Sequence, residues 1–235
     1  FGGTGLKASV LDPEGRMLVD RLRIDTPYPC PPPVMLQALA GLAAPLPPFD
    51  RVSVGFPGVV RDGRVLTAPH FGNEVWHEHP LAAALEKRLG KLVRLLNDAE
   101  VQGLGIIHGD GLEVVLTLGT GVGSAVFRHG RLMPHLELAQ HPLHKDKTYN
   151  GYVGDDARRR HGVKKWSARV LKMIAIVDTL LNYDTLYLGG GNAAHLKVKL
   201  PAHVKLASND AGITGGIRLW GGAMDELFTS HHAPD

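Results

Sequence analysis

The sequence predicts an α/β protein built from two similar lobes. Glycine-rich turns lie beside apolar, strand-like segments at two places, 2–5 and 119–123. In each half of the chain a hairpin is followed by alternating strand-like and helix-like segments. We therefore expect a duplicated α/β lobe and not a single doubly wound sheet, with an N-terminal lobe over 1–107 and a C-terminal lobe over 108–235. The last amphipathic segment, 212–227, is expected to pack back toward the N-terminal lobe.

The two glycine turns predict a pair of phosphate-binding loops. Glycine lets the backbone approach a phosphate closely, and successive N–H groups in such a turn can bind an anion. Neither turn is a Walker A motif, because no Gly-Lys-Ser/Thr triplet follows at the required spacing. One such loop would be a weak indication, but a loop in each half, with an acidic motif between them, favours an enzyme that binds phosphate groups.

Composition narrows the class of protein. The 235 residues are 44% hydrophobic and 21% charged, as in an ordinary globular protein, and no apolar run approaches the roughly 20 residues of a membrane-spanning helix. The single cysteine, Cys30, excludes an internal disulfide and fits the cytoplasm. A net charge of +3 suits an anionic substrate without arguing for nucleic acid or membrane partners. Because the chain begins within a motif and without Met, we expect residues upstream.

Local patterns predict the order of elements. Strands are expected over 7–10 and 16–19, joined by a turn at 12–15, and a proline-rich loop over 28–33. Leu81, Leu85 and Leu89 share a face of an expected helix over 80–89, which Gly90 ends. Ser167 is expected to cap a long helix that carries apolar residues at helical spacing. The other expected strands are 51–56, 92–96 (buried on both faces), 113–118, 124–127 and 185–188.

Asn97 and Asp98 follow the strand at 92–96. A carboxylate at the C-terminal end of a buried strand lies where α/β sheets place ligands. Phosphoryl transfer to an alcohol needs a base near the hydroxyl, so Asp98 can be that base, and Asn97 can hydrogen-bond adjacent hydroxyls. Asn and Asp also cap helices routinely, and this structural alternative remains open.

Four sequence blocks carry a family resemblance. They are Gly-Gly-Thr-Gly-Leu-Lys at 2–7, Val-Gly-Phe-Pro-Gly at 54–58, Leu-Asn-Asp-Ala-Glu at 96–100 and Leu-Gly-Thr-Gly-Val-Gly at 118–123. In this order and spacing the chain resembles the ROK family of sugar kinases and sugar-responsive repressors. A fifth block, Gly-Gly-Gly at 189–191, extends the resemblance over essentially the whole chain. Gly5 with Lys7 is closer to the polyphosphate glucokinase branch.

The resemblance implies an actin-like (ribonuclease H-like), two-lobed sugar kinase fold with Asp98 as catalytic base. It implies sugar contacts at Asn97 and Gly58, and Glu137 takes the first position of the family's Glu-x-Gly-His sugar motif. His70 stands where the family has a sugar-contacting Asn, and Gln140 stands where it has His unless His141 takes that role. The expected phosphate or nucleotide contacts are Gly2, Gly3, Thr4, Gly5, Lys7, Gly119, Thr120, Gly121, Gly189, Gly190 and Gly191.

The resemblance also implies the cofactors and partners. The reaction would use Mg²⁺ with ATP or inorganic polyphosphate, although no metal-ligating residue can be named, because the family's metal-associated Asp precedes the first glycine loop. Many ROK proteins carry a cysteine-rich zinc segment, but this chain has only His141 and His144 there, so no structural zinc is expected. The expected partners are a hexose, with glucose first, the phosphate donor and a second copy of the chain.

Two questions stay open at the level of sequence. The segment 145–172 is rich in Lys and Arg, which predicts either a solvated helix face or an electrostatic track for a polymeric anion. The chain can also be a sugar-sensing regulator that binds a hexose without turnover, or a kinase that lost activity through its altered sugar motif. Regulators of this family carry a helix-turn-helix ahead of the first loop, so the mass of the full-length protein discriminates between regulator and kinase.

Overall fold

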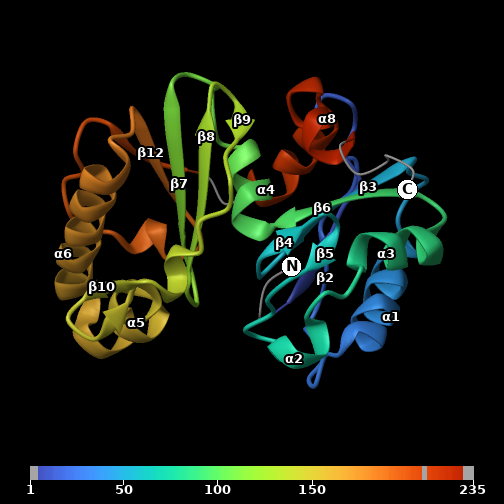
Figure 1. Ribbon diagram of the computed structural model, residues 1–235, viewed down its shortest axis with the longest axis horizontal. Coiled ribbons are helices and arrows are strands. Elements are labelled where there is room, and N and C mark those ends of the chain that lie inside the picture. Colours follow the sequence, from blue (N-terminus) through green and yellow to red (C-terminus); the bar gives the residue numbers. More distant parts are fainter. Residues whose placement is uncertain (1–4, 208–210, 230–235) are drawn as a thin grey trace. The chain divides into compact units, whose positions relative to one another are not determined.

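The computed structural model describes residues 5–207 and 211–229, which form two compact units (Figure 1). Unit 1 comprises Phe1–Gly105 and Gly212–Asp235, and unit 2 comprises Ile106–Ala211. Each unit has its own cluster of buried apolar side chains. Within the described ranges, no helix is both long and apolar enough to cross a membrane.

Unit 1 is built on two parallel strands, β3 (Arg51–Phe56) and β6 (Leu92–Asn97). Two small antiparallel pairs accompany them, β1 (Leu6–Ala8) with β2 (Leu22–Ile24) and β4 (Val60–Arg61) with β5 (Arg64–Val65). The helices are α1 (Pro32–Ala43), α2 (Asn73–Trp76), α3 (Leu81–Leu89), α4 (Asp98–Leu104), α7 (Ala211–Thr214), the 3-10 helix η3 (Gly215–Trp220) and α8 (Gly222–Thr229).

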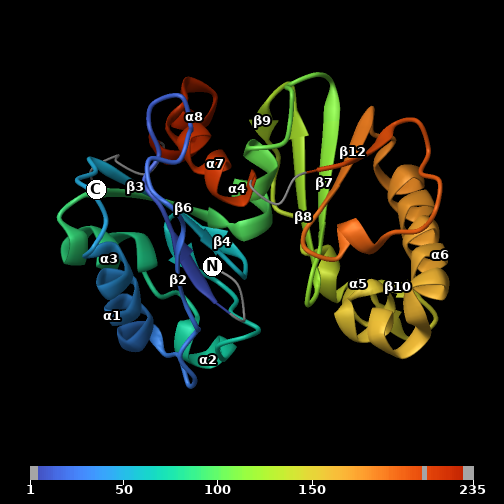
Figure 2. The ribbon, with the colours of Figure 1, turned by 180° about the vertical axis from the view of Figure 1, so that it is seen from behind.

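The last elements of the chain pack on β3 and β6 (Figure 2). The Ser53 hydroxyl donates to the carbonyl of Gly216 at 2.6 Å and accepts from the Trp220 indole at 2.9 Å. The guanidinium of Arg94 donates to Asp225 at 2.9 Å and lies 4.5 Å from the centre of the Trp220 ring. Unit 1 therefore depends on segments from both ends of the described chain.

Unit 2 is a five-stranded sheet with a long helix on one face. The strand order is β13–β12–β7–β8–β9, in which β12 pairs parallel with β7 and β13, and the other pairs are antiparallel. Their bounds are β7 (Leu112–Leu118), β8 (Val122–Arg128), β9 (Arg131–Leu132), β12 (Thr185–Gly189) and β13 (Val204–Leu206). Val114, Leu116 and Leu186 share one buried cluster with Val170 and Ile174 of α6 (Asp155–Leu181).

Smaller elements surround one end of the unit 2 sheet (Figures 1 and 2). The hairpin of β10 (Pro142–His144) and β11 (Lys147–Thr148) leads into α5 (Tyr149–Val153), which packs against the start of α6. Two 3-10 helices, η1 (Leu138–Gln140) and η2 (Ala193–His195), complete the unit. Gly162 interrupts α6 with φ +71° and ψ 158°, so this helix consists of two segments.

The expected strand at 16–19 is wrong. Only Met17 forms an isolated bridge, to Leu11, and β1 pairs instead with β2 at Leu22–Ile24. The cause is Asp12, whose carboxylate accepts the backbone N–H groups of Glu14 and Arg16 at 3.0 and 2.8 Å. Such a side chain offers the backbone an alternative to the strand ladder.

Three other expectations fail in detail. The loop expected over 28–33 ends early, because α1 begins at Pro32, where a missing N–H costs a helix nothing. Ser167 does not begin a helix: α6 starts at Asp155, and the fully buried Ser167 accepts a hydrogen bond from Lys197 N–H. Leu92 of β6 is 65% exposed, so that strand is not buried on both faces along its whole length.

Candidate active site

Asp98 lies at the junction of β6 and α4. The strand ends at Asn97 and the helix begins at Asp98, which is half-buried. Asn97 accepts from Ala99 N–H at 2.9 Å, and Glu100 accepts from Asn97 N–H at 3.0 Å, which together form a capping box. The capping alternative is thus confirmed for Asn97, and it fixes the backbone from which Asp98 projects.

Gly58 lies beside this capping box. The amide of Asn97 donates to the carbonyl of Gly58 at 3.0 Å and reaches that of Phe56 at 3.4 Å. A Cβ at Gly58 would lie 2.0 Å from the carbonyl oxygen of Thr67, so no side chain fits there. The structure therefore brings Asn97, Asp98 and Gly58 together. His70 lies on an exposed loop, and its ring is 6.4 Å from that of Phe71.

The second glycine loop connects β7 to β8 in unit 2. Gly119 N–H donates to the carbonyl of Gly121 at 2.9 Å, which closes a tight turn with Thr120 exposed at its tip. Val122 N–H donates to the side chain of Asn150 at 2.7 Å. A Cβ at Gly121 would lie 2.6 Å from the same Asn150 oxygen. A side chain at this position would therefore displace Asn150.

The Gly-Gly-Gly block at 189–191 lies against this loop. Gly189 pairs with Thr117 at the end of β7, and Gly190 has φ +82°, a left-handed conformation that favours glycine. A Cβ at Gly190 would come within 2.4 Å of the Leu118 carbonyl oxygen. The structure thus brings the blocks at 119–121 and 189–191 together within unit 2, while Gly191 is exposed.

Three residues that hold the loop were not among the predicted site residues. Asn192 donates to the carbonyl of Gly119 at 3.0 Å and to Asp155 at 3.2 Å. Asp155 N–H donates to the same Gly119 carbonyl at 3.1 Å, and Asn150 receives the loop N–H of Val122. The position of Asn192 directly after three glycines was the only local signal, because all three contacts join residues distant in sequence.

Glu137, Gln140 and His141 share one turn in unit 2. Glu137 precedes η1, which ends at Gln140, and all three side chains are exposed. A carboxylate oxygen of Glu137 lies 3.5 Å from His135 Nε2, and the His141 ring centre lies 6.4 Å from that of Tyr149. The turn presents a carboxylate, an amide and an imidazole to solvent, the side-chain types that bind sugar hydroxyls.

The first glycine loop is described only in part. Gly2, Gly3 and Thr4 lie outside the described residues. Gly5 is buried, and a Cβ there would lie 3.1 Å from the guanidinium of Arg23, while Lys7 is exposed on β1. Among the side chains of the described ranges, no group of three or more His, Cys, Asp or Glu is arranged to hold a metal ion.

Comparisons with known proteins agree with this arrangement. The model of the ROK family matches residues 1–135. Polyphosphate glucokinase of Mycobacterium tuberculosis is 28% identical over 231 residues, which cover 91% of this chain and 86% of that protein. The inorganic polyphosphate/ATP-glucomannokinase of Arthrobacter sp. strain KM is 30% identical with a TM-score of 0.79, and the match covers 92% of this chain and 94% of that one.

The fold has further solved counterparts. A ROK family glucokinase from Streptomyces griseus, whose structure was solved with glucose and AMPPNP, superposes with a TM-score of 0.72. The match covers 93% of this chain and 96% of that one at 19% identity, which shows a shared fold. The expected α/β, actin-like kinase fold is confirmed. Since the family model spans more than half of the sequence and relatives align over most of it, the chain belongs to the ROK family.

Proposed function

We propose that the chain is a hexose kinase that transfers a phosphoryl group from ATP or inorganic polyphosphate to a sugar hydroxyl, with glucose as the first substrate to test. The relatives named polyphosphate glucokinase and polyphosphate/ATP-glucomannokinase support both the reaction and the two donors. Membership of the ROK family does not by itself establish kinase activity, because a sugar-sensing regulator without turnover has the same fold.

The position of Asp98 carries the proposal. The capping box of Asn97 and Glu100 fixes the backbone between the strand end and the helix start, from which the Asp98 side chain projects. As general base it accepts the hydroxyl proton as the sugar oxygen attacks phosphorus. Asn97 keeps a second lone pair on the oxygen that caps the helix, and this lone pair can accept a bond from a neighbouring hydroxyl.

The glycine blocks of unit 2 would bind the donor. Their backbone N–H groups can stabilise the charge on the phosphate oxygens, because close approach requires residues without side chains. Mg²⁺ would arrive with the donor, since this ion takes many of its ligands from phosphates and water and needs only one or two carboxylates. Its role would be to neutralise charge on the transferred group.

The proposed sugar-binding residues are Asn97, Gly58 and His70 in unit 1, and Glu137, Gln140 and His141 in unit 2. A homodimer and a cytoplasmic location are proposed as well. The buried thiol of Cys30 fits that location, and burial raises its pKa, which makes the thiol less reactive.

The deciding experiment measures product formation with ATP and with polyphosphate, each against a panel of hexoses and amino sugars. A kinase phosphorylates at least one hexose with at least one donor. Binding of a hexose, measured by calorimetry, without turnover from either donor would contradict the proposal and favour the sugar-sensing regulator.

A further inference from the structure

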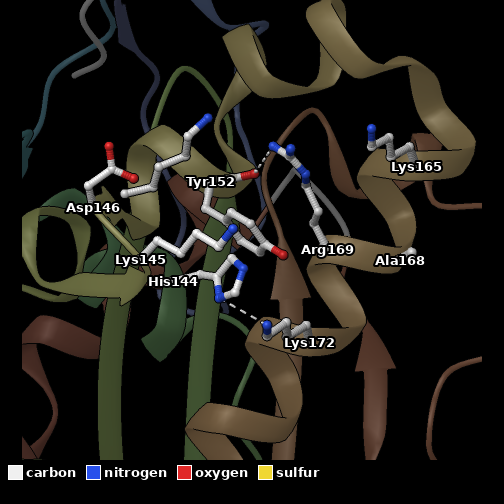
Figure 3. A pocket seen from close by; sticks show the side chains of 9 residues that line it. His144, Lys145, Asp146, Tyr152, Lys165, Ala168, Arg169 and Lys172 are labelled. Atoms are coloured by element: carbon white, nitrogen blue, oxygen red, sulfur yellow. Dashed lines mark hydrogen bonds between the residues drawn. The ribbon is translucent and has the colours of Figure 1, made fainter.

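A basic pocket lies in unit 2 between the β10–β11 hairpin and α6 (Figure 3). Its volume is about 400 Å³, and it is lined from two separate segments of the chain. Five of the lining residues are cationic and one is acidic, Asp146. The cations are Lys145, Lys147, Lys165, Arg169 and Lys172.

The pocket cations differ from the three arginines near the start of α6. Arg158 and Arg159 form ion pairs with Asp155 at 2.8 and 2.6 Å, and Arg160 pairs with Asp156 at 3.2 Å. Among the residues that the structure describes, the five pocket cations form no ion pair with a carboxylate. Within the segment 145–172, the three arginines at 158–160 are therefore neutralised by carboxylates, whereas the pocket cations are not paired in this way.

The pocket is also partly preorganised. The guanidinium of Arg169 donates to the carbonyl of Tyr152 at 3.3 Å and lies 4.8 Å from the centre of the same residue's ring. Lys172 Nζ lies 3.0 Å from His144 Nδ1 (Figure 3). Holding like charges around one space is unfavourable unless an anion enters it, so the arrangement favours an anionic ligand over a merely solvated face.

Burial and the positive charge of the pocket lower the pKa of two histidines, His144 and His161. Burial lowers the pKa of His144, and Lys172, Lys145 and Arg169 lower it further. Burial also lowers the pKa of His161, with Arg169 and Lys165 as the next causes. Arg169 acts on both imidazoles, which agrees with a shared region of positive potential.

The pocket adjoins the helix that supports the second glycine loop. Tyr152, whose ring and carbonyl hold Arg169, lies on α5 two positions after Asn150. Asn150 in turn accepts the N–H of Val122 in the loop. Two residues of a helix rise about 3 Å, so the anchor of Arg169 and the brace of the loop are neighbours within unit 2.

We propose that this pocket is an accessory subsite for inorganic polyphosphate, which binds phosphate groups of the chain beyond the one that is transferred. The proposal rests on the proposed kinase function and extends it by naming where the polymeric donor is held. A compact nucleotide triphosphate has no distant phosphates to place there, whereas a long chain does. Binding at the pocket would therefore increase the affinity for polyphosphate and leave the affinity for ATP unchanged.

The test replaces two pocket lysines of α6 with glutamine. Lys165→Gln and Lys172→Gln, singly and together, remove pocket charge from exposed positions, and Lys164→Gln changes an exposed neighbour that does not line the pocket. We expect the double variant to raise the KM for long-chain polyphosphate about tenfold and to reduce its salt dependence, while the KM for ATP and hexose stays unchanged. Lys164→Gln should behave as wild type.

Direct binding separates this proposal from the kinase assignment. Calorimetry of the intact chain with long polyphosphate, tripolyphosphate and orthophosphate needs no turnover. If the double variant binds long polyphosphate more weakly than wild type and Lys164→Gln do, the subsite is supported, even where no sugar is phosphorylated. A turnover with polyphosphate that is equal in all variants would overturn the subsite while the kinase function stands. Orthophosphate binding as tightly as the polymer would also overturn it, because the site would then recognise a single phosphate.

Discussion

At the scale of single residues, Asp98 is positioned by its neighbours in the chain. We expect Asp98→Asn to lower kcat by about 10²- to 10⁴-fold, because the amide keeps the shape of the side chain but cannot take the proton. Hexose affinity and the unfolding temperature should change little. Steady-state kinetics and calorimetry on the same preparation check this.

Asp50→Asn provides the matched control in unit 1, since Asp50 is 83% exposed and pairs with the adjacent Arg51 at 3.4 Å. This control should keep wild-type kcat. Near-normal kcat in Asp98→Asn would leave the residue with no catalytic role, and the junction of β6 and α4 would then be a purely structural feature.

Gly121 permits a second test at this scale. In Gly121→Val the new Cβ would meet the Asn150 oxygen that accepts the N–H of Val122, so the bond that braces the loop is disturbed. We expect the donor KM to rise far more than the hexose KM, because the displaced amides belong to the proposed phosphate loop. Asn150→Ala, which removes the brace without adding bulk, should shift the donor KM in the same direction. Equal changes in both KM values would indicate general misfolding.

The site could be predicted from sequence where its contacts are local. Asn97, Asp98 and Glu100 lie within four positions, so the capping box and its carboxylate could be predicted from the order of residues alone. Asn150 and Asn192 could not, because each contacts the second glycine loop across a long stretch of chain. Whether a particular Asn reaches a loop depends on the folded sheet, which no local pattern encodes.

At the scale of elements, the same distinction explains which segments were predicted. The strand at 51–56 and the helix ended by Gly90 carry strong local signals, and both agree with the structure. The start of α6 was missed because 155–165 is highly charged and its apolar spacing becomes regular only later. The strand expected at 16–19 failed because one carboxylate, Asp12, outweighed a pattern of alternation.

Two buried tyrosines of unit 2, Tyr183 and Tyr187, predict how the stability of the protein changes at alkaline pH. Burial raises the pKa of Tyr187 to about 12, assisted by its hydrogen bond to Glu113 at 3.1 Å. Since the folded pKa exceeds the ordinary value of 10.0, this stabilisation is complete below pH 10 and is lost as the pH rises toward 12. Urea unfolding of the wild type should therefore give a falling free energy of unfolding over this range.

Tyr187→Phe should flatten that dependence. Below pH 10 the variant should be less stable by about 1 kcal/mol, because Glu113 loses one donor. Tyr183→Phe is the companion variant, since burial and then Asp178 raise the pKa of Tyr183 to about 12 as well. An alkaline profile identical to wild type in both variants would show that neither phenol controls unfolding.

At the scale of the whole molecule, the two buried clusters predict separate stability of the units. Cluster residues from Val114 to Val204 all belong to unit 2, which is continuous in sequence. We expect a fragment of residues 106–207 to fold alone, with a helical circular dichroism spectrum and a cooperative thermal transition. A fragment of residues 1–105 should be much less stable, because Arg94 and Ser53 lose their partners in η3 and α8. A fragment 106–207 without a cooperative transition would contradict this prediction.

The division of unit 1 into two stretches of sequence has a consequence for how the protein is made. Domains generally fold from the N-terminus onward as the ribosome releases them. Here, the segment that receives Arg94 and Ser53 is translated only after all of unit 2. Unit 2 can thus reach its native state on the ribosome before the last helices of unit 1 have been synthesised. A chaperone that shields nascent chains would accordingly act on residues 1–105 for longer than on residues 106–211.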